Sequence, residues 1–547
     1  MSHAVVRGEP RPAQLHLDKV LGDVLASRGQ PRAGSSREGA NLAQILFHCL
    51  RNNPQGIFMI NGHTGEIITN DKILRDAVSL ARAMISQGAR GKTVTLLMRN
   101  HQRMVAMYLA SLFAQTLPFM QDPSTTVFEL THYLKLIEPR FVFCDAEHEE
   151  VLLSSLKELP DLHTEVVMLE TEEHLHAFAT GFSRDPEGFD IPERDLESPV
   201  MMLPTSGSTG LPKAALMTER GLIAQLPGVW MYHTEFPQPT RLAMVLTTLQ
   251  WMTFTMTFTS SVVYHIPLLI SPKPTSVNVV KDMLIKFRPT WTFFGPAFVK
   301  RLLPEITADH FSSLKTLTLL GAPVSMDLLA AIQDKLPKDA HLCDGYGTTE
   351  TQGYIAIPDR DAPLKSNGRV FNILHYKMVD PDGKEIGLCQ NGELYVKGVS
   401  CIQGYYKNDE IYAETFTGGW YKTGDMFYID ENERLYYLER LKFSFKFNGC
   451  QVSPEEVEAV VSSVDGVQEC VVCGTEAGPA AAVVLQPGRD VTPRQIHKAV
   501  DANLSEHKRL HGGLVIVPSL PHTHSGKLKR GECQKLLLGL IQTDVTQ

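Results

Sequence analysis

A run of hydroxyl-bearing residues and glycines ends in a lysine near the middle of the chain. It reads Thr205, Ser206, Gly207, Ser208, Thr209, Gly210, Leu211, Pro212 and Lys213. Glycines let backbone N–H groups approach anionic oxygens, hydroxyls add further donors, and the lysine adds a positive charge. Without the G-x-x-x-x-G-K-[ST] register, the run is not a Walker A loop. Such runs are usually flexible surface loops, but apolar residues on both sides favour a polyphosphate-binding loop between buried strands.

A second glycine-rich turn lies further along the chain. It reads Asp344, Gly345, Tyr346, Gly347, Thr348, Thr349 and Glu350. A tyrosine can stack on a purine, a threonine can bond a phosphate oxygen, and a glutamate can hold Mg²⁺ as a hard oxygen ligand. Taken alone, the same residues also fit an ordinary turn with a core tyrosine.

Three later segments add charged side chains that could work with these two turns. Asp425 ends the segment Tyr421-Lys422-Thr423-Gly424-Asp425, and a basic stretch runs from Arg440 to Lys446. Lys527 ends the short turn His524-Ser525-Gly526-Lys527. The plain alternative for Lys527 is a solvated surface charge.

The elements that would position these residues follow an α/β rhythm. Short apolar runs at 93–98, 141–144, 290–294 and 316–320 are separated by helix-like stretches, which predicts largely parallel sheets. The segments 392–397 and 434–438 instead alternate apolar and polar residues, as expected of a more exposed sheet. Ser453-Pro454-Glu455-Glu456 reads as a capping box that opens a small C-terminal α+β unit.

Composition limits the class of protein. A chain of 547 residues implies two or more domains, and 43% apolar with 21% charged residues is ordinary for a globular protein. The net charge of −9, without a basic block, predicts no nucleic-acid partner. Nine cysteines without framework spacing indicate a reducing compartment, and Cys470 and Cys473 in a valine-rich run are expected to pack in a core.

Targeting and membrane signals are weak. Residues 1–40 are expected to form a partly ordered tail with one docked helix around Leu17, Leu21, Val24 and Leu25. The start lacks a secretory apolar region and the end is not a peroxisomal tripeptide, so a cytoplasmic location is predicted. The stretch 242–270 lacks charged residues, but its threonines, its serines and Pro267 favour a buried element of a soluble core over a transmembrane segment.

The motifs, in this order over roughly residues 41–535, resemble the adenylate-forming superfamily of acyl- and aryl-CoA synthetases, peptide-synthetase adenylation domains and beetle luciferases. The luciferase and coumarate–CoA ligase branch is the most similar, because Lys508-Arg509-Leu510-His511-Gly512-Gly513 also matches it. The resemblance implies an α/β fold. It would comprise a large domain over 41–438, with parallel sheets and a small β-barrel-like part, and a mobile α+β lid over 439–547.

The resemblance also implies a two-step reaction on a small carboxylic acid. The acid attacks the α-phosphate of ATP and releases pyrophosphate, and a thiol, usually coenzyme A, then displaces AMP. ATP, Mg²⁺ and coenzyme A are the implied cofactors, and the oligomeric state is left open. The alternatives are a luciferase-like oxygenase that uses the adenylate, transfer to a carrier protein, and a non-catalytic nucleotide- or acyl-binding protein with this fold.

Roles for individual residues follow from the same resemblance. The loop from Thr205 to Lys213 would hold the β- and γ-phosphates, Thr349 the α-phosphate and Glu350 the Mg²⁺. Tyr346 would stack on adenine. The remaining adenosine contacts are Gly321, Ala322, Pro323, Asp344, Asp425 on the ribose, and Arg440.

The lid residues would act in turn. Lys527 would neutralise charge in the first step, and the lid would then rotate about a hinge at Lys442. Lys446 and the backbone of Gly449 would then face the coenzyme A tunnel.

Several positions depart from the family pattern. Trp251 stands where a histidine is common before the acyl pocket, Leu320 replaces a small residue before Gly321, and Tyr354 replaces a small residue of luciferases. These three larger side chains predict a narrowed acyl pocket and a slimmer acid than a luciferin. The lid is expected to be shortened between Cys473 and Ala481.

Overall fold

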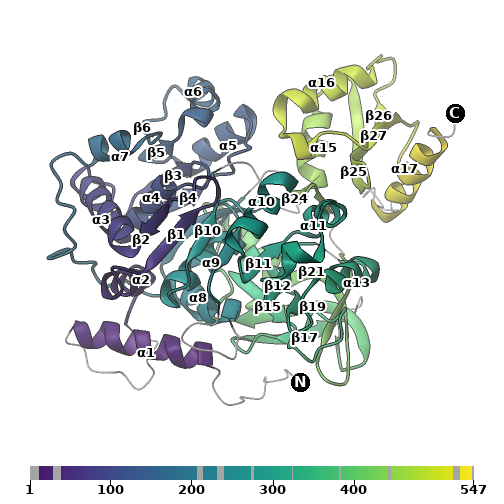
Figure 1. Ribbon diagram of the computed structural model, residues 1–547. Coiled ribbons are helices and arrows are strands. Elements are labelled where there is room, and N and C mark those ends of the chain that lie inside the picture. Colours follow the sequence, from purple (N-terminus) through teal and green to yellow (C-terminus); the bar gives the residue numbers. More distant parts are fainter. Residues whose placement is uncertain are drawn as a thin grey trace.

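The computed structural model describes residues 12–28, 39–205, 213–230, 240–272, 276–322, 324–380, 383–440, 445–521 and 530–544. The chain forms a large N-terminal body, and its last elements form a smaller body beside it (Figure 1). This arrangement confirms the predicted mixed α/β fold with a large N-terminal and a small C-terminal domain.

One sheet of the large domain has the strand order β6-β5-β3-β4-β7-β8. Neighbouring strands are parallel except for the β7–β8 pair, which is antiparallel. Most of these strands are buried along their length, which explains their continuous apolar runs. The strands are β3 (Thr93–Leu97), β4 (Leu117–Met120), β5 (Phe141–Cys144), β6 (Glu165–Met168), β7 (Pro199–Thr205) and β8 (Lys213–Thr218).

A second sheet has the order β13-β12-β11-β9-β10-β1-β2 and is parallel except for β1–β2. Two of its parallel strands lead into predicted site residues. Strand β12 ends at Leu319, just before Gly321, and β13 ends at Asp344, where the second glycine-rich turn begins. The strands are β1 (Ile57–Asn61), β2 (Ile67–Thr69), β9 (Ala243–Val245), β10 (Leu268–Ile270), β11 (Trp291–Phe294), β12 (Thr316–Leu319) and β13 (His341–Asp344). Ligand sites of such sheets lie at the carboxyl ends of the strands.

Helices cover these two sheets (Figure 1). Several begin at side-chain caps, such as the capping box that Thr126 and Glu129 form at α5. The helices are α2 (Leu42–Asn52), α3 (Asn70–Ser86), α4 (Gln102–Phe113), α5 (Val127–Ile137), η1 (Ala146–His148), α6 (Glu149–Lys157), α7 (Glu172–Phe178), α8 (Glu219–Gln225), η2 (Leu226–Trp230), α9 (Met252–Val263), α10 (Val277–Phe287), α11 (Pro296–Leu302), η3 (Leu303–Glu305), α12 (Ala308–Phe311) and α13 (Met326–Lys335).

An antiparallel sheet follows, and it contains the strands predicted at 392–397 and 434–438. Its order is β18-β17-β19-β21-β20, with β22 paired to β21, and a smaller sheet β14-β15-β16 precedes it. These elements are β14 (Tyr346–Thr348), η4 (Thr349–Thr351), β15 (Gly353–Ile357), β16 (Arg369–Val370), β17 (Leu374–Val379), β18 (Glu385–Ile386), β19 (Gln390–Gly398), α14 (Asp409–Thr415), β20 (Phe416–Thr417), β21 (Trp420–Ile429) and β22 (Leu435–Arg440).

The C-terminal domain packs helices on the sheet β25-β26-β27. Cys470 and Cys473 of β25 are buried in different apolar clusters, which confirms that this pair packs in the core. The expected shortening coincides with a tight hairpin, in which Thr475 pairs with Gly478. The elements are β23 (Phe445–Phe447), β24 (Cys450–Val452), α15 (Pro454–Ser462), β25 (Val467–Thr475), β26 (Gly478–Leu485), α16 (Pro493–Asn503), η5 (Glu506–Lys508), β27 (Gly513–Ile516) and α17 (Arg530–Asp544).

The capping box predicted at α15 does not form. The Ser453 side chain makes no capping hydrogen bond to the helix. The carboxylate of Glu456 instead accepts a 2.8 Å hydrogen bond from the Lys508 ammonium. A buried charge partner is therefore preferred over the local cap.

The N-terminal helix α1 (Pro12–Ser27) docks on the large domain, as predicted. Leu17, Leu21, Val24 and Leu25 are all buried. The Tyr264 hydroxyl donates a 2.9 Å hydrogen bond to the Ala13 carbonyl.

The stretch 242–270 forms β9, α9 and β10, all of them largely buried. In the described part of the chain, no helix combines the length and apolar character needed to cross a membrane.

Candidate functional site

A cavity of about 760 Å³ opens where the carboxyl ends of the parallel strands meet the antiparallel sheet and the first hairpin of the C-terminal domain. Most of the predicted site residues line it together. They are Thr205, Lys213, Trp251, Leu320, Gly321, Ala322, Asp344, Gly345, Tyr346, Gly347, Thr349, Glu350, Tyr354, Asp425 and Lys446. Segments more than 200 residues apart in sequence thus form one site.

Other predicted residues are not placed in the cavity. Gly449 lies in the turn between β23 and β24 and does not line it. Several lie outside the described residues, namely Ser206, Gly207, Ser208, Thr209, Gly210, Pro323, Lys442 and Lys527, together with the side chain of Arg440.

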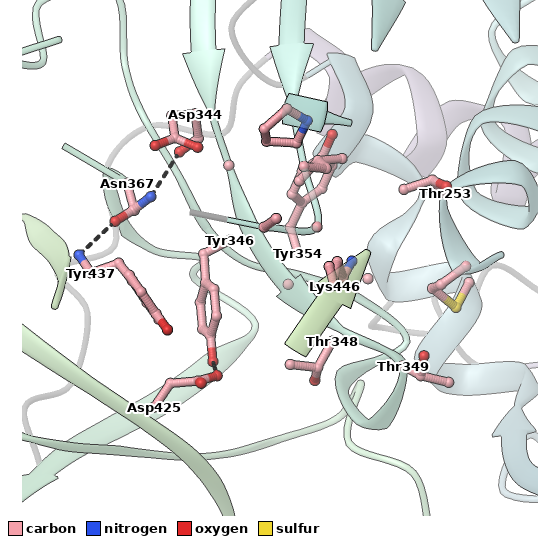
Figure 2. A pocket seen from close by; sticks show the side chains of 18 of the residues that line it. Thr253, Asp344, Tyr346, Thr348, Thr349, Tyr354, Asn367, Asp425, Tyr437 and Lys446 are labelled. Atoms are coloured by element: carbon pink, nitrogen blue, oxygen red, sulfur yellow. Dashed lines mark hydrogen bonds between the residues drawn. The ribbon is translucent and has the colours of Figure 1, made fainter. Parts of the chain in front are cut away.

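Tyr346 and Asp425 meet at one end of the cavity (Figure 2). The Tyr346 hydroxyl donates a 2.6 Å hydrogen bond to Asp425 Oδ2, and the Phe427 ring packs edge-on 4.7 Å from the Tyr346 ring. The Asp425 backbone N–H donates to the Thr423 hydroxyl. An aromatic face and a buried carboxylate therefore lie side by side, which suits a purine nucleoside.

A short polar chain lies next to this pair. The Asn367 side-chain amide donates a 3.3 Å hydrogen bond to the backbone carbonyl of Asp344. Its oxygen accepts a 2.8 Å hydrogen bond from the backbone N–H of Tyr437. Burial raises the pKa of the Asp344 carboxyl to about 7, and hydrogen bonding of that carboxyl with the Asn367 side chain partly offsets this rise. Asn367 and Tyr437 line the cavity but were not predicted, because the only local signal is the turn dipeptide Asn367-Gly368.

Three hydroxyls converge on the carboxylate of Glu350. Oε1 accepts a 2.9 Å hydrogen bond from Tyr405 and a 3.3 Å hydrogen bond from Thr205. Oε2 accepts a 3.4 Å hydrogen bond from Tyr421. Burial and the charge of Glu350 raise the pKa of Tyr405 well above its usual range, so this phenol remains a donor. The Lys213 ammonium lies 5.2 Å from the centre of the Tyr405 ring. The predicted phosphate loop therefore begins at Thr205, which contacts the Glu350 carboxylate, and ends at Lys213, which lies beside Tyr405.

This donor set fits Mg²⁺. Mg²⁺ prefers oxygen ligands and is usually held by one or two carboxylates together with substrate phosphates. The Glu350 carboxylate and the Thr205 hydroxyl are hard oxygen donors that face the cavity from two elements.

The other side of the cavity is more apolar. Trp251 directly precedes α9, Met256 lies within α9, and Leu320 follows β12. A methyl carbon added to Gly345 would lie 3.1 Å from both the Leu320 and Tyr354 side chains, so these two residues close over the turn. The three enlarged side chains noted in the sequence, Trp251, Leu320 and Tyr354, thus all line the cavity.

Lys446 enters the cavity from the C-terminal domain (Figure 2). Its ammonium lies 5.3 Å from the ring of Trp251. Gly321 has a φ of +94°, and a Cβ at this position would lie 2.5 Å from Lys446 Nζ. The positive φ favours glycine at this position, and the absence of a side chain leaves room for the Lys446 ammonium.

A buried ionic cluster joins the two domains. The Lys508 ammonium lies between the carboxylates of Glu129 in α5 and Glu456 in α15. Ser505 donates 3.1 Å to Glu129, and Thr126 donates 3.1 Å to the Asn503 carbonyl. Burial opposes the charge on Glu129, but the Lys508 ammonium outweighs it and holds the pKa of this carboxyl below its usual range.

Comparison with known proteins agrees with this geometry. The family described as AMP-binding enzyme matches residues 46–406, and the AMP-binding enzyme C-terminal domain matches residues 456–527. Luciferin 4-monooxygenase of Photuris pensylvanica is 26% identical, with 87% of this chain and 90% of that protein covered. A 4-coumarate–CoA ligase of Humulus lupulus is 27% identical, with 86% of this chain and 89% of that protein covered.

Solved structures show the same fold. An o-succinylbenzoate CoA synthetase from Bacillus subtilis superposes with a TM-score of 0.79 at 21% identity, covering 91% of this chain and 98% of its own. The amide bond synthetase McbA from Marinactinospora thermotolerans gives a TM-score of 0.77 at 21% identity, covering 91% and 99%. The chain therefore belongs to the AMP-binding enzymes of the adenylate-forming superfamily.

Proposed function

We propose that this protein is an ATP-dependent ligase that activates a small carboxylic acid as its acyl-adenylate and transfers the acyl group to coenzyme A. The observation that carries the proposal is the position of Lys446, which reaches from the C-terminal domain into a cavity that also holds Asp425 and Glu350. A cation beside both the nucleotide end and the acyl wall suits a second step in which a thiol displaces AMP.

The nucleotide end of the cavity would bind ATP in a fixed orientation. Asp425 would accept hydrogen bonds from the ribose hydroxyls, and the Tyr346 ring would pack against adenine. Lys213 and the hydroxyl of Thr205 stand at the two ends of the phosphate loop and would contact the β- and γ-phosphates. Thr349 would bond the α-phosphate.

Glu350 and Thr205 would hold Mg²⁺, which would screen the charge of the phosphates when bound. The hydroxyls of Tyr405 and Tyr421 donate hydrogen bonds that orient the Glu350 carboxylate. Because these bonds fix the carboxylate before substrates bind, little reorganisation would be needed at that point.

Two lysines of the C-terminal domain would act in succession. Lys527, by its match to the family motif, would stabilise the negative charge that develops on the α-phosphate during adenylation. A rotation about Lys442 would then replace it by Lys446, with Gly449 at the entry path of the thiol.

The acyl wall favours a slim acid. Trp251, Leu320 and Tyr354 all line the cavity. By the resemblance noted in the sequence, Trp251 would replace a frequent histidine, Leu320 a small residue, and Tyr354 a small residue of luciferases. A luciferase-like oxygenase is the second candidate, because luciferin 4-monooxygenases are as similar in sequence as the CoA ligases. The narrowed wall argues against a bulky heteroaromatic luciferin.

The test is pyrophosphate release from ATP and Mg²⁺ across short, medium and long fatty acids and aryl acids. Release with one class of acid is expected. Light emission from a supplied luciferin, without thioester formation, would favour the oxygenase instead. No release with any acid, despite ATP binding, would favour a binding protein that retains the fold.

A further inference from the structure

A buried glutamine holds the backbone behind the acyl wall. Gln225 ends α8 and is 2% exposed. Its amide nitrogen donates 2.9 Å to the Tyr354 carbonyl and 3.1 Å to the Thr351 carbonyl, and its oxygen accepts 3.2 Å from the Tyr354 N–H. One side chain thus binds both backbone groups of Tyr354, as a neighbouring strand would.

A second glutamine secures the other end of α8. Gln352 has a φ of +54°, and its amide oxygen accepts 2.9 Å from the Thr218 N–H while its nitrogen donates 3.0 Å to the Thr218 hydroxyl. Thr218 is the N-cap of α8. The turn from Thr349 to Tyr354 is therefore tied to both ends of one short helix.

The turn is tightly packed against its neighbours. A Cβ on Gly353 would lie 2.7 Å from the Met256 sulfur and 2.8 Å from the Gln225 amide. A Cβ on Gly228, in η2 directly after α8, would lie 3.3 Å from the Tyr354 ring. The ring of Tyr354 is thus packed against η2, the segment directly after Gln225.

Gln225 itself does not line the cavity, whereas the turn it holds does so on two sides. Thr349 and Glu350 face the nucleotide end, and Tyr354 lies on the acyl wall. A shift of this turn would move the acyl wall relative to the nucleotide. A misplacement of about 1 Å can lower the rate by roughly 10²-fold.

We propose that Gln225 is a positioning residue that sets the width of the acyl wall through the backbone of Tyr354, and so determines which carboxylic acids are accepted. This inference rests on the proposed function. Burying a side-chain amide costs free energy unless its donors and acceptors are hydrogen-bonded. The bonds of Gln225 to the turn meet this requirement.

The test compares two buried glutamines whose side chains each bond backbone groups. Gln225→Met removes the hydrogen bonds but keeps the length of the side chain. Gln44→Met is the matched control, because Gln44 is also buried, bonding the Ile191 carbonyl and the Asn41 N–H away from the cavity. Gln225→Glu keeps an acceptor for the Tyr354 N–H and loses the donor.

With the acid found for the wild type, Gln225→Met is expected to raise the KM for the acid about tenfold and to leave the KM for ATP within about twofold. Its preference for that acid over a bulkier analogue is expected to fall by about tenfold as well. Gln225→Glu should be intermediate, and Gln44→Met should keep the wild-type preference. Equal preference in Gln225→Met and Gln44→Met would overturn the assignment.

A second measurement does not depend on activity. Hydrogen exchange of the peptide 349–356 in the AMP-bound protein should be faster in Gln225→Met than in wild type, and unchanged in Gln44→Met. If the wild type activates no acid, the proposed ligase function fails, but faster exchange still supports the anchoring role. Unchanged exchange in Gln225→Met would overturn that role whatever the activity.

Discussion

The ammonium of Lys446 lies 5.3 Å from the ring centre of Trp251, so a residue of the C-terminal domain is in direct contact with the acyl wall of the large domain. The Glu129–Lys508–Glu456 cluster supports the same orientation from the domain interface. The structure thus presents an arrangement in which Lys446 of the C-terminal domain faces the cavity.

Lys446→Ala and Lys527→Ala should separate the two half-reactions. Lys527→Ala is expected to slow acid-dependent pyrophosphate release by about 10²–10³-fold, because it removes a cation from the developing charge. Lys446→Ala should slow the conversion of a supplied acyl-adenylate with coenzyme A more than it slows adenylation. Single-turnover kinetics of each step measure this, and equal losses in both steps for either variant would refute its assignment.

Glu129→Gln should weaken the orientation seen here without disrupting the C-terminal domain, because Lys508 keeps Glu456 as its partner. The thioester step is expected to slow by roughly tenfold, in the usual range for coupling between sites, while adenylation stays within about twofold.

The control for this variant is Glu138→Gln at the opposite, C-terminal end of the same helix. Glu138 pairs with Lys407 at 2.7 Å, but both side chains are exposed and belong to the large domain. This change should leave both steps as in wild type. A thioester step as fast in Glu129→Gln as in Glu138→Gln would show that the ionic cluster does not favour the second step.

Asp425→Asn should weaken nucleotide binding. The change removes a buried charged acceptor, and bonds to charged groups contribute about 1.5–3 kcal/mol, so the dissociation constant for AMP should rise roughly 10–100-fold. Calorimetry with AMP measures this directly. Wild-type affinity in this variant would place the ribose elsewhere in the cavity.

Glu219→Gln should stabilise the protein at alkaline pH. Burial raises the pKa of Glu219 from 4.5 to about 7. Its carboxylate accepts a 2.9 Å hydrogen bond from the Leu42 N–H and lies 3.9 Å from the Arg194 guanidinium. Folding therefore favours the protonated form, so this group stabilises the fold fully below pH 4.5 and loses that contribution as pH rises through about 7.

Unfolding of wild type and Glu219→Gln should therefore diverge with pH. The two are expected to have similar free energies of unfolding near pH 5. The variant should be more stable by about 1–3 kcal/mol at pH 8.5, since one pKa unit corresponds to about 1.4 kcal/mol. A difference that is constant from pH 5 to 8.5 would show that Glu219 does not titrate in this range.

Leu320→Gly should widen the acyl wall. It removes one of the two side chains that close over Gly345, and a pocket change of a few methylene groups alters discrimination by about 10–200-fold. The ratio of kcat/KM for a bulky and a slim acid should rise accordingly. An unchanged ratio would mean that the acid does not contact this wall.

The sequence predicted the parts that rest on local patterns. The parallel strands were recognisable because strands buried on both faces read as continuous apolar runs. The docked helix α1 was recognisable from the spacing of Leu17, Leu21, Val24 and Leu25. Most site residues were found because they stand in short ordered motifs.

Contacts between distant segments were not predictable in this way. Tyr405 donates to Glu350 from 55 residues away, and Lys508 reaches Glu129 across 379 residues, and neither pair has a local pattern. The capping box expected at Ser453 failed for the same reason, because Glu456 had a tertiary partner that outweighs the local one. Gln225 was missed because a single glutamine at a helix end carries no signal.

The most direct test of the central claim is to follow products with ATP, Mg²⁺ and the acid panel, with and without coenzyme A. If the protein is the proposed ligase, one class of acid should give equal amounts of AMP and acyl-CoA when coenzyme A is present. Without coenzyme A, the reaction should stop after a single turnover. Pyrophosphate release with no thioester under any condition would contradict it.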